Sequence, residues 1–343
     1  MKPRRPLKSF LGALLGAAAL LVGIASAPAS RAEELEAGKA TGAEIQAFRD
    51  AYVPQQYSPP APGWIYADAC VLTLLVASGT WLVLAGRPAR WISVHLVAAL
   101  VYFGLLRGGC VCPVGATSNV AIGLVRPALI GRAELAIFLV PLVAALIGGR
   151  TFCGAACPLG AVQHIVSPRR ARPLERWLHR LLLALPIAVL FATVWSALAG
   201  PIFFVCRLDP YTPIFFQSHA LVQKATSWIT PQFAEPGIVI AGSRWAWLAV
   251  AVALLLGWLV PRIFCRYLCP YGVLLGALSL AAFRRRQIDP EACSRCGKCE
   301  RECPVQAITV PAAPRRPEIS AYQCIQCGRC SGVCPRGANP SMG

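Results

Sequence analysis

The C-terminal part of the chain contains a duplicated cysteine pattern that decides what this region can fold around. In each copy, two residues separate the first three cysteines, and a fourth cysteine, followed directly by proline, comes three residues later. The two copies are Cys293, Cys296, Cys299 and Cys303, and Cys324, Cys327, Cys330 and Cys334. In this pattern each run gives three thiolates to one [4Fe–4S] cluster, and its fourth cysteine binds the other cluster. We therefore expect two clusters, held by Cys293, Cys296, Cys299 and Cys334, and by Cys324, Cys327, Cys330 and Cys303.

Zinc ligation and a disulfide framework are the alternative interpretations of these thiols. Zinc needs four ligands at each site, but its chemistry gives no reason for a duplicated run that ends in Cys-Pro. Gly297 and Gly328 each follow the second thiol of a run, where the backbone must curl tightly and direct N–H groups towards sulfur. The pattern therefore favours iron–sulfur clusters.

The composition of the whole chain is that of a membrane protein with a soluble tail. Of the 343 residues, 56% are hydrophobic and 14% are charged, and the mean hydropathy is +0.57. The net charge of +18 does not indicate nucleic-acid binding, because the basic residues lie at the ends of apolar runs and form no stripe with interleaved aromatic residues. We expect these basic residues to set the membrane topology instead.

The N-terminal region begins with basic residues and an apolar run at about residues 7–27. Residues 1–30 form either a signal peptide or a first membrane anchor, and Pro28, directly after the candidate cleavage position at Ala27, favours the anchor. Residues 31–64 are polar and end in a proline-rich stretch. We expect them to be a short exported segment, too short for a globular domain.

Five further apolar segments follow, near residues 65–85, 91–106, 134–148, 181–205 and 245–263. The alternation of Arg-rich and Arg-poor connections places the N-terminus, the Arg-rich loops and the C-terminal tail in the cytoplasm, where a reducing environment also protects the thiols. The predicted fold is an α-helical polytopic membrane protein of about five to six transmembrane helices with a duplicated helical hairpin. Its membrane core covers residues 65–283, and a small two-cluster ferredoxin-like α+β domain covers residues 284–343.

An internal repeat lies within the predicted membrane core. The stretch from Arg150 to Gly160 matches that from Arg262 to Gly272 in its Arg, Phe, Cys-x3-Cys-Pro and Gly positions, which indicates a duplicated hairpin. The repeat supplies four thiols at one predicted membrane boundary: Cys153, Cys157, Cys265 and Cys269. Four is the ligand number of one further iron–sulfur cluster, and this is our hypothesis. The alternative is that Cys-Pro-x-Gly merely ends a helix, with cysteine as a small apolar filler.

Three more cysteines are expected at the exported side. Cys110 and Cys112, in Cys-Val-Cys-Pro-Val-Gly, should lie at the exported end of the second segment, and Cys206 at the corresponding end of the fifth. A disulfide between Cys206 and one of the pair, and a redox or metal site, are equally compatible with the sequence. Among polar residues near the apolar segments, His95 or Asp209 is our candidate proton acceptor for a quinol.

With its paired Cys-x3-Cys-Pro motifs and its two-cluster tail, the chain resembles the NapH- and NosR-type membrane ferredoxins over about residues 65–335. Those relatives are associated with quinol oxidation, with electron delivery to exported reductases, or with maintenance of a copper enzyme of nitrous oxide reduction. The resemblance implies electron transfer between the quinone pool, cytoplasmic clusters and exported partners. The Cys110-x-Cys112-Pro half-motif fits the NosR-like side better.

The chain departs from the NosR-type pattern in one respect. Those relatives carry a large exported domain with FMN attached to a Thr in a Ser/Thr-Gly-Ala-Thr context. Here Val114 precedes Gly115-Ala116-Thr117 where a hydroxyl residue is needed, and the exported segment is short. We therefore expect no covalent FMN on this chain, and expect any flavin to be on a separate partner.

Two classes of function fit these observations. The first is an electron-transfer protein of the bacterial cytoplasmic (inner) membrane, possessing [4Fe–4S] clusters and working between the quinone pool, an exported flavoprotein or reductase, and a cytoplasmic electron donor. Such a protein would be an electron-transfer component, for example a quinol dehydrogenase subunit. The second class is a maturation or regulatory factor for an exported metalloenzyme, which reduces a metal or a disulfide. Replacing Cys110, Cys112 and Cys206 distinguishes the two, because only the second class needs the outer thiols.

Overall fold

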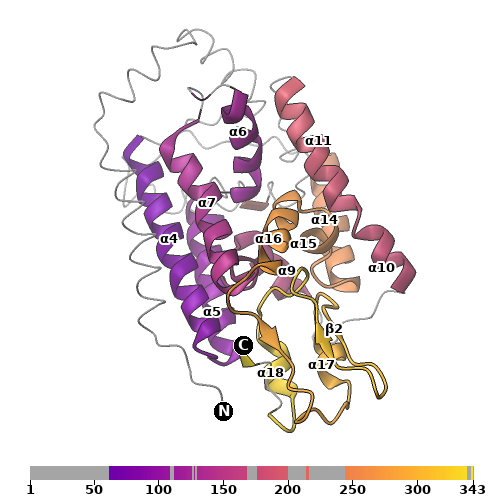
Figure 1. The fold of residues 1–343 in the computed structure, drawn as a ribbon. Coiled ribbons are helices and arrows are strands. Elements are labelled where there is room, and N and C mark those ends of the chain that lie inside the picture. Colours follow the sequence, from indigo (N-terminus) through magenta and orange to yellow (C-terminus); the bar gives the residue numbers. More distant parts are fainter. Residues whose placement is uncertain are drawn as a thin grey trace.

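The computed structural model describes residues 62–108, 112–125, 127, 130–167, 176–199, 214–215, 244–337 and 341–342. The predicted signal or anchor and exported segment, together with Cys110, Cys206 and Asp209, lie outside these residues. Most of the described chain is helical (Figure 1). A small domain with short strands forms the C-terminal end.

Two helices open the described chain. Helix α4 spans Pro62–Leu84, and α5 spans Ala89–Ala99 and continues as a π-helical segment, η1, over Leu100–Leu106. Within the described residues, Trp64–Leu84 and Ala89–Leu106 are the two stretches long and apolar enough to cross a membrane. They match the first two predicted segments. The total number of membrane crossings stays a prediction.

The other helices are shorter, and their bounds follow the proline and glycine positions of the sequence. They are α6 (Pro113–Val125), α7 (Arg132–Gly148), α8 (Thr151–Ala155), α9 (Pro158–Val166), α10 (Arg176–Leu182), α11 (Leu185–Ala199), α14 (Arg244–Leu259), α15 (Ile263–Tyr267) and α16 (Pro270–Leu280). Pro158 and Pro270 stand at the first position of α9 and α16, where the missing N–H costs nothing. Helix α6 was not among the predicted segments.

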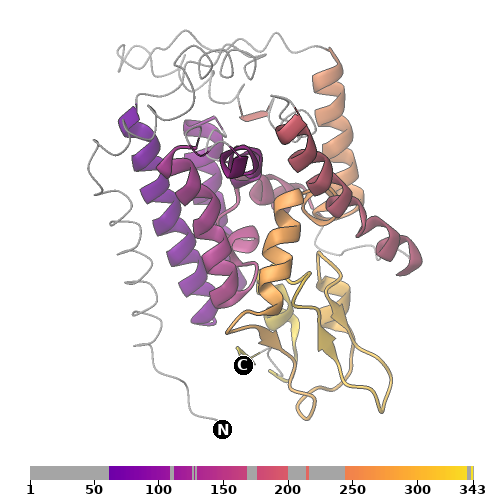
Figure 2. The same cartoon turned by 45° about the horizontal axis from the view of Figure 1, so that its top comes forward.

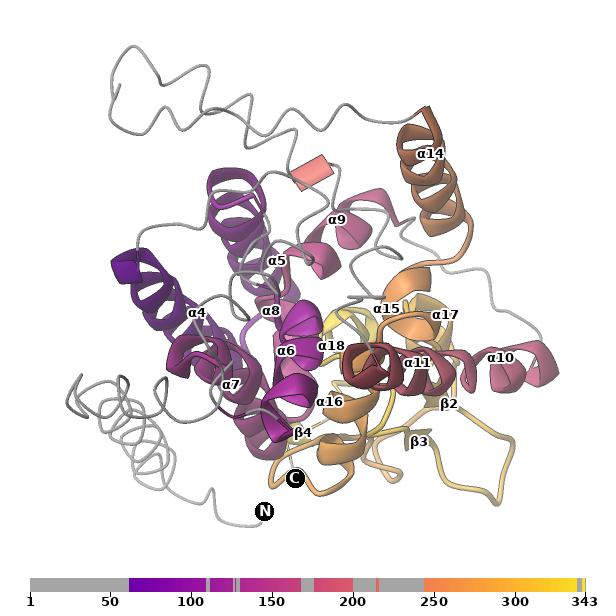
Figure 3. The ribbon, with the colours of Figure 1, turned by 90° about the horizontal axis from the view of Figure 1, so that it is seen from above.

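The helices pack around one apolar core. Helix α4 packs against α7, α5 and α8, while α16 packs against α7 and α11. Seen from above, α6 lies between α7 and α11 (Figure 3). Leu72, Phe103 and Tyr271 are fully buried in this core. On the outside, large apolar side chains such as Phe191 and Trp195 of α11 are exposed, as is typical of surfaces that meet lipid or another protein.

The C-terminal domain is built from two short antiparallel strand pairs and two short helices. Strand β1 (Arg286–Gln287) pairs with β4 (Ser341–Met342), and β2 (Ile308–Thr309) pairs with β3 (Glu318–Ile319). Helices α17 (Lys298–Glu302) and α18 (Arg329–Val333) each begin inside one cysteine run and pack on each other. This agrees with the predicted ferredoxin-like α+β domain.

The C-terminal domain sits at one end of the helices (Figure 2) and packs closely on them. At Gly154 of α8, an added Cβ would lie 2.1 Å from the carbonyl oxygen of Ile325, so only glycine allows this approach. Ile325 is fully buried. Ser279 of α16 also donates a hydrogen bond to the carbonyl oxygen of Ala321 at 2.7 Å. The start of the second cysteine run and the residues just before it therefore pack directly on the helices.

Candidate functional site

Thiol set 1 lines one cavity in the C-terminal domain. Its members are Cys293, Cys296, Cys299 and Cys334, and Ile308, Val310 and Cys330 also line this cavity. The fold thus brings the fourth cysteine of the second run beside the first run, as the spacing predicts. Cys296 is exposed to solvent, and a hydrogen bond from the backbone of Lys298 lowers the pKa of its thiol. Among the eight thiols of the C-terminal domain, Cys296 is the exposed one.

Thiol set 2 consists of Cys324, Cys327, Cys330 and Cys303. Cys303 is buried and interacts electrostatically with Cys327 and Cys324, so the second crossing is also present in the fold. Burial raises the pKa of the Cys324 and Cys330 thiols to about 12. Such thiols become ligands only when bound metal displaces their protons.

The two runs have the same backbone conformation around their second cysteine. Gly297 and Gly328 have φ angles of 67° and 75°, and the residues two positions before them, Arg295 and Gln326, have φ angles of 55° and 59°. The expected tight curl at both glycines is therefore confirmed. In the first run the Arg295 N–H donates to the Sγ of Cys293 at 3.4 Å, which is the kind of hydrogen bond that stabilises a metal thiolate.

The inner thiols form a third set between the helices. They are Cys153 of α8, Cys265 of α15, and Cys157 and Cys269, which stand directly before α9 and α16. Each interacts electrostatically with the others. The structure therefore brings two thiols from each repeat to one place. The sequence had grouped the same four.

Gln163 of α9 is a fully buried neighbour of the inner thiols. Its Nε2 donates to the Sγ of Cys265 at 3.1 Å, and its Oε1 accepts the N–H of Phe264 at 3.1 Å. The amide is therefore fixed in one orientation by a backbone donor. The sequence gives little sign of this role, because a single glutamine in an apolar helix has no characteristic spacing.

Three buried arginines belong to the two repeats: Arg150 and Arg262 interact with the inner thiols, and Arg266 interacts with Cys303 of thiol set 2. Arg150, Arg262 and Arg266 expose only 6%, 1% and 7% of their surface, and each keeps buried N–H groups without a hydrogen-bond partner among the described residues. A buried cation with unpaired donors is costly unless a negative group compensates it. Thiolates around a cluster with net negative charge would supply that compensation, so the donor set fits an iron–sulfur cluster.

A single metal ion fits less well. The thiolates of a zinc site all lie about 2.3 Å from one ion. Within the part of the chain that the structure describes, no three Cys, His, Asp or Glu side chains converge in this way. In a four-iron cube each thiolate binds a different iron, so the ligands stand further apart.

Of the outer group of three cysteines, the structure describes Cys112. Its neighbour Arg107 lies beside Trp64 at the start of α4, but Cys112 packs against the central apolar cluster and interacts with Tyr271. Helix α6 begins directly after Cys112, and its first two residues, Pro113 and Val114, are buried. Cys110 and Cys206 lie outside the described residues, so the outer group of three remains a prediction.

His95, one candidate proton acceptor, is hydrogen-bonded at both ring nitrogens. Its Nδ1 lies 2.8 Å from the carbonyl oxygen of Ala155, and its Nε2 lies 2.8 Å from the Oγ of Ser78. Both ring nitrogens are therefore used to join α4, α5 and α8. The other candidate, Asp209, lies outside the described residues.

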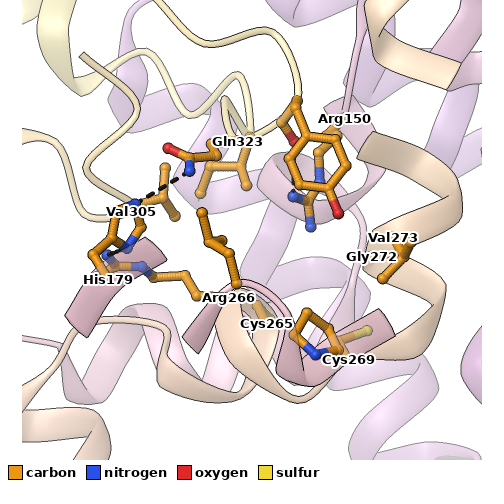
Figure 4. A pocket seen from close by; sticks show the side chains of 13 residues that line it. Arg150, His179, Cys265, Arg266, Cys269, Gly272, Val273, Val305 and Gln323 are labelled. Atoms are coloured by element: carbon orange, nitrogen blue, oxygen red, sulfur yellow. Dashed lines mark hydrogen bonds between the residues drawn. The ribbon is translucent and has the colours of Figure 1, made fainter. Parts of the chain in front are cut away.

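A cavity lies between the inner thiols and the C-terminal domain (Figure 4). It is lined by Cys265 and Cys269 on one side, by Val305, Tyr322, Gln323 and Ile325 on the other, and by Arg150, His179, Leu183, Pro186, Arg266, Gly272 and Val273. His179 Nδ1 faces Arg266 Nη2 at 3.2 Å, so this nitrogen must accept. Burial and the Arg266 charge lower the pKa of His179, which keeps the ring neutral.

Comparisons with known proteins agree with this arrangement. A family model described as a 4Fe-4S binding domain matches residues 131–175 and again residues 243–288, the two repeats. A second model, a 4Fe-4S dicluster domain, matches residues 292–338.

Three curated relatives illustrate the similarity. The putative electron transport protein YccM of Escherichia coli is 25% identical over 226 residues, which cover 62% of this chain and 59% of YccM. The methylamine utilization ferredoxin-type protein MauN of Paracoccus denitrificans is 30% identical over 197 residues, or 54% of this chain and 57% of MauN. The regulatory protein NosR of Pseudomonas aeruginosa is 33% identical over 167 residues, or 48% of this chain and 21% of NosR. Each match spans less than two thirds of the relative. No solved structure matches the chain.

Proposed function

We propose that this chain, which belongs to the NapH/NosR type of membrane ferredoxins, is a membrane-bound electron-transfer protein with three [4Fe–4S] clusters. The observation that carries this proposal is the position of the inner thiols directly beside the domain that holds thiol sets 1 and 2. Each cluster, when bound, supplies one-electron chemistry at a potential set by its hydrogen bonds and solvent access. The residues of the chain hold the clusters and exclude water. They also separate the inner thiols, at one end of the set of clusters, from thiol set 1 with its exposed Cys296, at the other.

The C-terminal domain is oriented so that its two thiol sets have different surroundings. The second run meets the helices, with Ile325 buried and the carbonyl oxygen of Tyr322 accepting a hydrogen bond from Arg150 at 3.1 Å. The first run exposes Cys296. A soluble cytoplasmic electron donor or acceptor would therefore meet thiol set 1. The quinone pool, or an exported flavoprotein or reductase, would exchange electrons at the inner end.

A quinol headgroup would find suitable groups in the cavity between the inner thiols and the C-terminal domain. Apolar walls with a few converging polar side chains are typical of sites for small organic ligands, and His179 is held neutral there. Leu183 and Pro186 of the cavity wall lie just before α11 and in its first turn, respectively, and Phe191 and Trp195 of this helix are exposed. The cavity is thus adjacent to an apolar surface from which a lipid-soluble quinol could approach.

Anaerobic titration of oxidised protein with duroquinol tests the electron-transfer proposal. We expect bleaching of cluster absorbance and the appearance of paramagnetic signals. Reduction by dithionite alone would contradict the quinol-linked proposal and would point to a cytoplasmic donor. His179→Leu should raise the duroquinol concentration for half-maximal reduction about tenfold, as for loss of roughly one hydrogen bond. His164→Leu is the matched control, since His164 does not line the cavity.

The alternative function is maturation or regulation of an exported metalloenzyme. The name of the relative NosR as a regulatory protein favours keeping it. A maturation factor would need the outer thiols to handle its target. Replacement of Cys110, Cys112 and Cys206 by Ser should then abolish maturation, whereas a plain electron carrier would keep clusters that a quinol can reduce.

A further inference from the structure

Two buried arginines occupy equivalent positions in the two repeats. Arg150 and Arg262 each stand three residues before the first cysteine of a Cys-x3-Cys-Pro motif. Buried arginines normally pair with carboxylates. Between described residues, however, the only ion pair joins Arg107 and Asp68, far along the chain from either motif. The charge of Arg150 and Arg262 has therefore no carboxylate partner in this part of the chain.

The two side chains reach across to the opposite repeat. Arg262 of the second repeat donates from Nη1 to the carbonyl oxygen of Cys153 in the first, at 2.7 Å, and the same nitrogen lies beside Gly160. Arg150 of the first repeat places its Nη2 beside Gly272 in the second. Each arginine thus lies on the Cys-Pro-x-Gly turn of the other repeat, and the glycine of that turn leaves the room for it.

The guanidinium groups lie against the inner thiols. Arg150 Nη2 is 4.0 Å from the Sγ of Cys153, and Arg150 also interacts electrostatically with Cys265 and Cys269. Arg262 interacts in the same way with Cys265. Arg150 Nε and Arg262 Nε and Nη2 are buried donors without a partner among the described residues. Two fixed positive charges with spare donors therefore face one group of four thiols.

We propose that Arg150 and Arg262 form an exchanged arginine clamp that stabilises the negative charge of the cluster bound by the inner thiols. This inference rests on the proposed third cluster. A cluster with four thiolates gains one negative charge on reduction, so fixed positive charges favour the reduced state and raise the potential. The arginines are positioning residues: they also tie each repeat to the other around the cluster. The functional motif of each repeat is then Arg-x-Phe-Cys-x3-Cys-Pro-x-Gly.

Redox titration followed by EPR tests the clamp. In Arg262→Gln the inner cluster should show a lower midpoint potential, while the two C-terminal clusters keep theirs. Arg262→Lys retains the positive charge, so the midpoint potential of its inner cluster should be close to that of the wild type. Arg262 is the better residue to substitute, because Arg150 also donates a hydrogen bond to the carbonyl oxygen of Tyr322, just before the second cysteine run. Arg90→Gln, which removes an exposed arginine of α5, is the matched control and should change no potential.

Stability of iron-free protein gives a second readout that does not depend on the cluster. Without iron, the buried charge is uncompensated, so Arg262→Met should leave the thermal midpoint of iron-free protein unchanged or higher. In the iron-loaded protein, Arg262→Met should lower the thermal midpoint. A merely structural arginine would destabilise both forms equally, and that result would overturn the clamp.

The outcomes separate the clamp from the function on which it rests. If the wild-type protein contains about eight iron atoms per chain, both the third cluster and the clamp are refuted. About twelve iron atoms with an unchanged inner potential in Arg262→Gln would overturn the clamp alone. The clamp would be established by about twelve iron atoms per chain, a lowered potential of the inner cluster in Arg262→Gln, and a potential near the wild-type value in Arg262→Lys.

Discussion

The two Cys-x3-Cys-Pro repeats share their thiols, arginines and glycines but differ in how they meet the C-terminal domain. After its first cysteine, the first repeat has Gly154, against which the backbone of Ile325 packs. The second repeat has Arg266 at that position, and its side chain donates to Gln306. A duplicated core thus binds an internally duplicated domain unequally. The first repeat meets the second cysteine run through the backbone of Ile325, whereas the second repeat meets the end of the first run, whose Cys296 stays exposed.

Substitution of Gly154 is the strongest way to break this difference. In Gly154→Ala the new Cβ would overlap the carbonyl oxygen of Ile325, at 2.1 Å, and backbone cannot move aside as a side chain can. We expect a loss of stability of at least about 1–3 kcal/mol, measured by thermal unfolding, and faster proteolytic release of the C-terminal domain. Gly332→Ala, where no atom lies within 4 Å, is the control. An unchanged midpoint for Gly154→Ala would contradict the close packing.

The glycines of the two Cys-Pro-x-Gly turns offer a second comparison. A Cβ at Gly160 would lie 2.9 Å from the backbone oxygen of Cys153, whereas at Gly272 the nearest atom is Nη2 of Arg150, at 2.8 Å. Gly160→Ala should therefore cost about 1–2 kcal/mol of stability, partly offset by helix propensity. Gly272→Ala should change stability little and instead move Arg150. Calorimetry and redox titration of both variants check this, and equal effects would contradict it.

Much of the cluster chemistry could be predicted from the sequence because it is local. The cysteine spacings fix which thiols converge in the C-terminal domain, and the glycines after the second cysteines adopt the predicted left-handed conformation. The grouping of the inner thiols also followed, because a repeat within one chain indicates equivalent positions. These features depend on the order of residues along the chain rather than on distant packing.

The remaining features depend on contacts between distant segments, which the sequence does not show. Arg150 and Arg262 were recognised as part of the repeat, but their exchange between repeats is a property of packing. Gly154 has no local turn to signal its role. The packing of Cys112 against the central apolar cluster likewise depends on distant segments, and no motif signals it.

A third test concerns Gln163, whose equivalent in the second repeat is Leu275. Among the inner thiols, Cys265 therefore receives the shorter side-chain N–H contact, 3.1 Å from Gln163 Nε2, compared with 4.0 Å from Arg150 Nη2 to Cys153. Gln163→Leu makes the repeats alike and should lower the inner cluster's potential by roughly 20–60 mV, the equivalent of about 0.5–1.5 kcal/mol for one hydrogen bond. EPR-monitored titration measures the shift. Gln287→Leu, on an exposed strand position, should give none; a shift there of the same size would refute the local explanation.

The smallest expected effect is a pH dependence at the contact between α9 and the C-terminal domain. His164 lies 3.3 Å from Nη2 of Arg329, and burial, with the charges of Arg262 and Arg329, lowers its pKa to about 4. The unfolded chain, with a His pKa of about 6.5, binds more protons in the interval between the two values. The contribution of neutral His164 to the free energy of unfolding is therefore fully present above about pH 6.5 and is lost as the pH falls towards about 4. His164→Gln should show a weaker decrease in thermal midpoint over that interval, and an identical pH profile would contradict the assignment.

The most direct measurement is the iron content of purified protein together with the EPR spectrum of its reduced form, in the wild type and in the double variant Cys157→Ser, Cys269→Ser. We expect about twelve iron atoms per chain in the wild type and about eight in the variant, which should keep the signals of the two C-terminal clusters. About eight iron atoms and the same spectrum in both proteins would contradict a cluster held jointly by the two repeats.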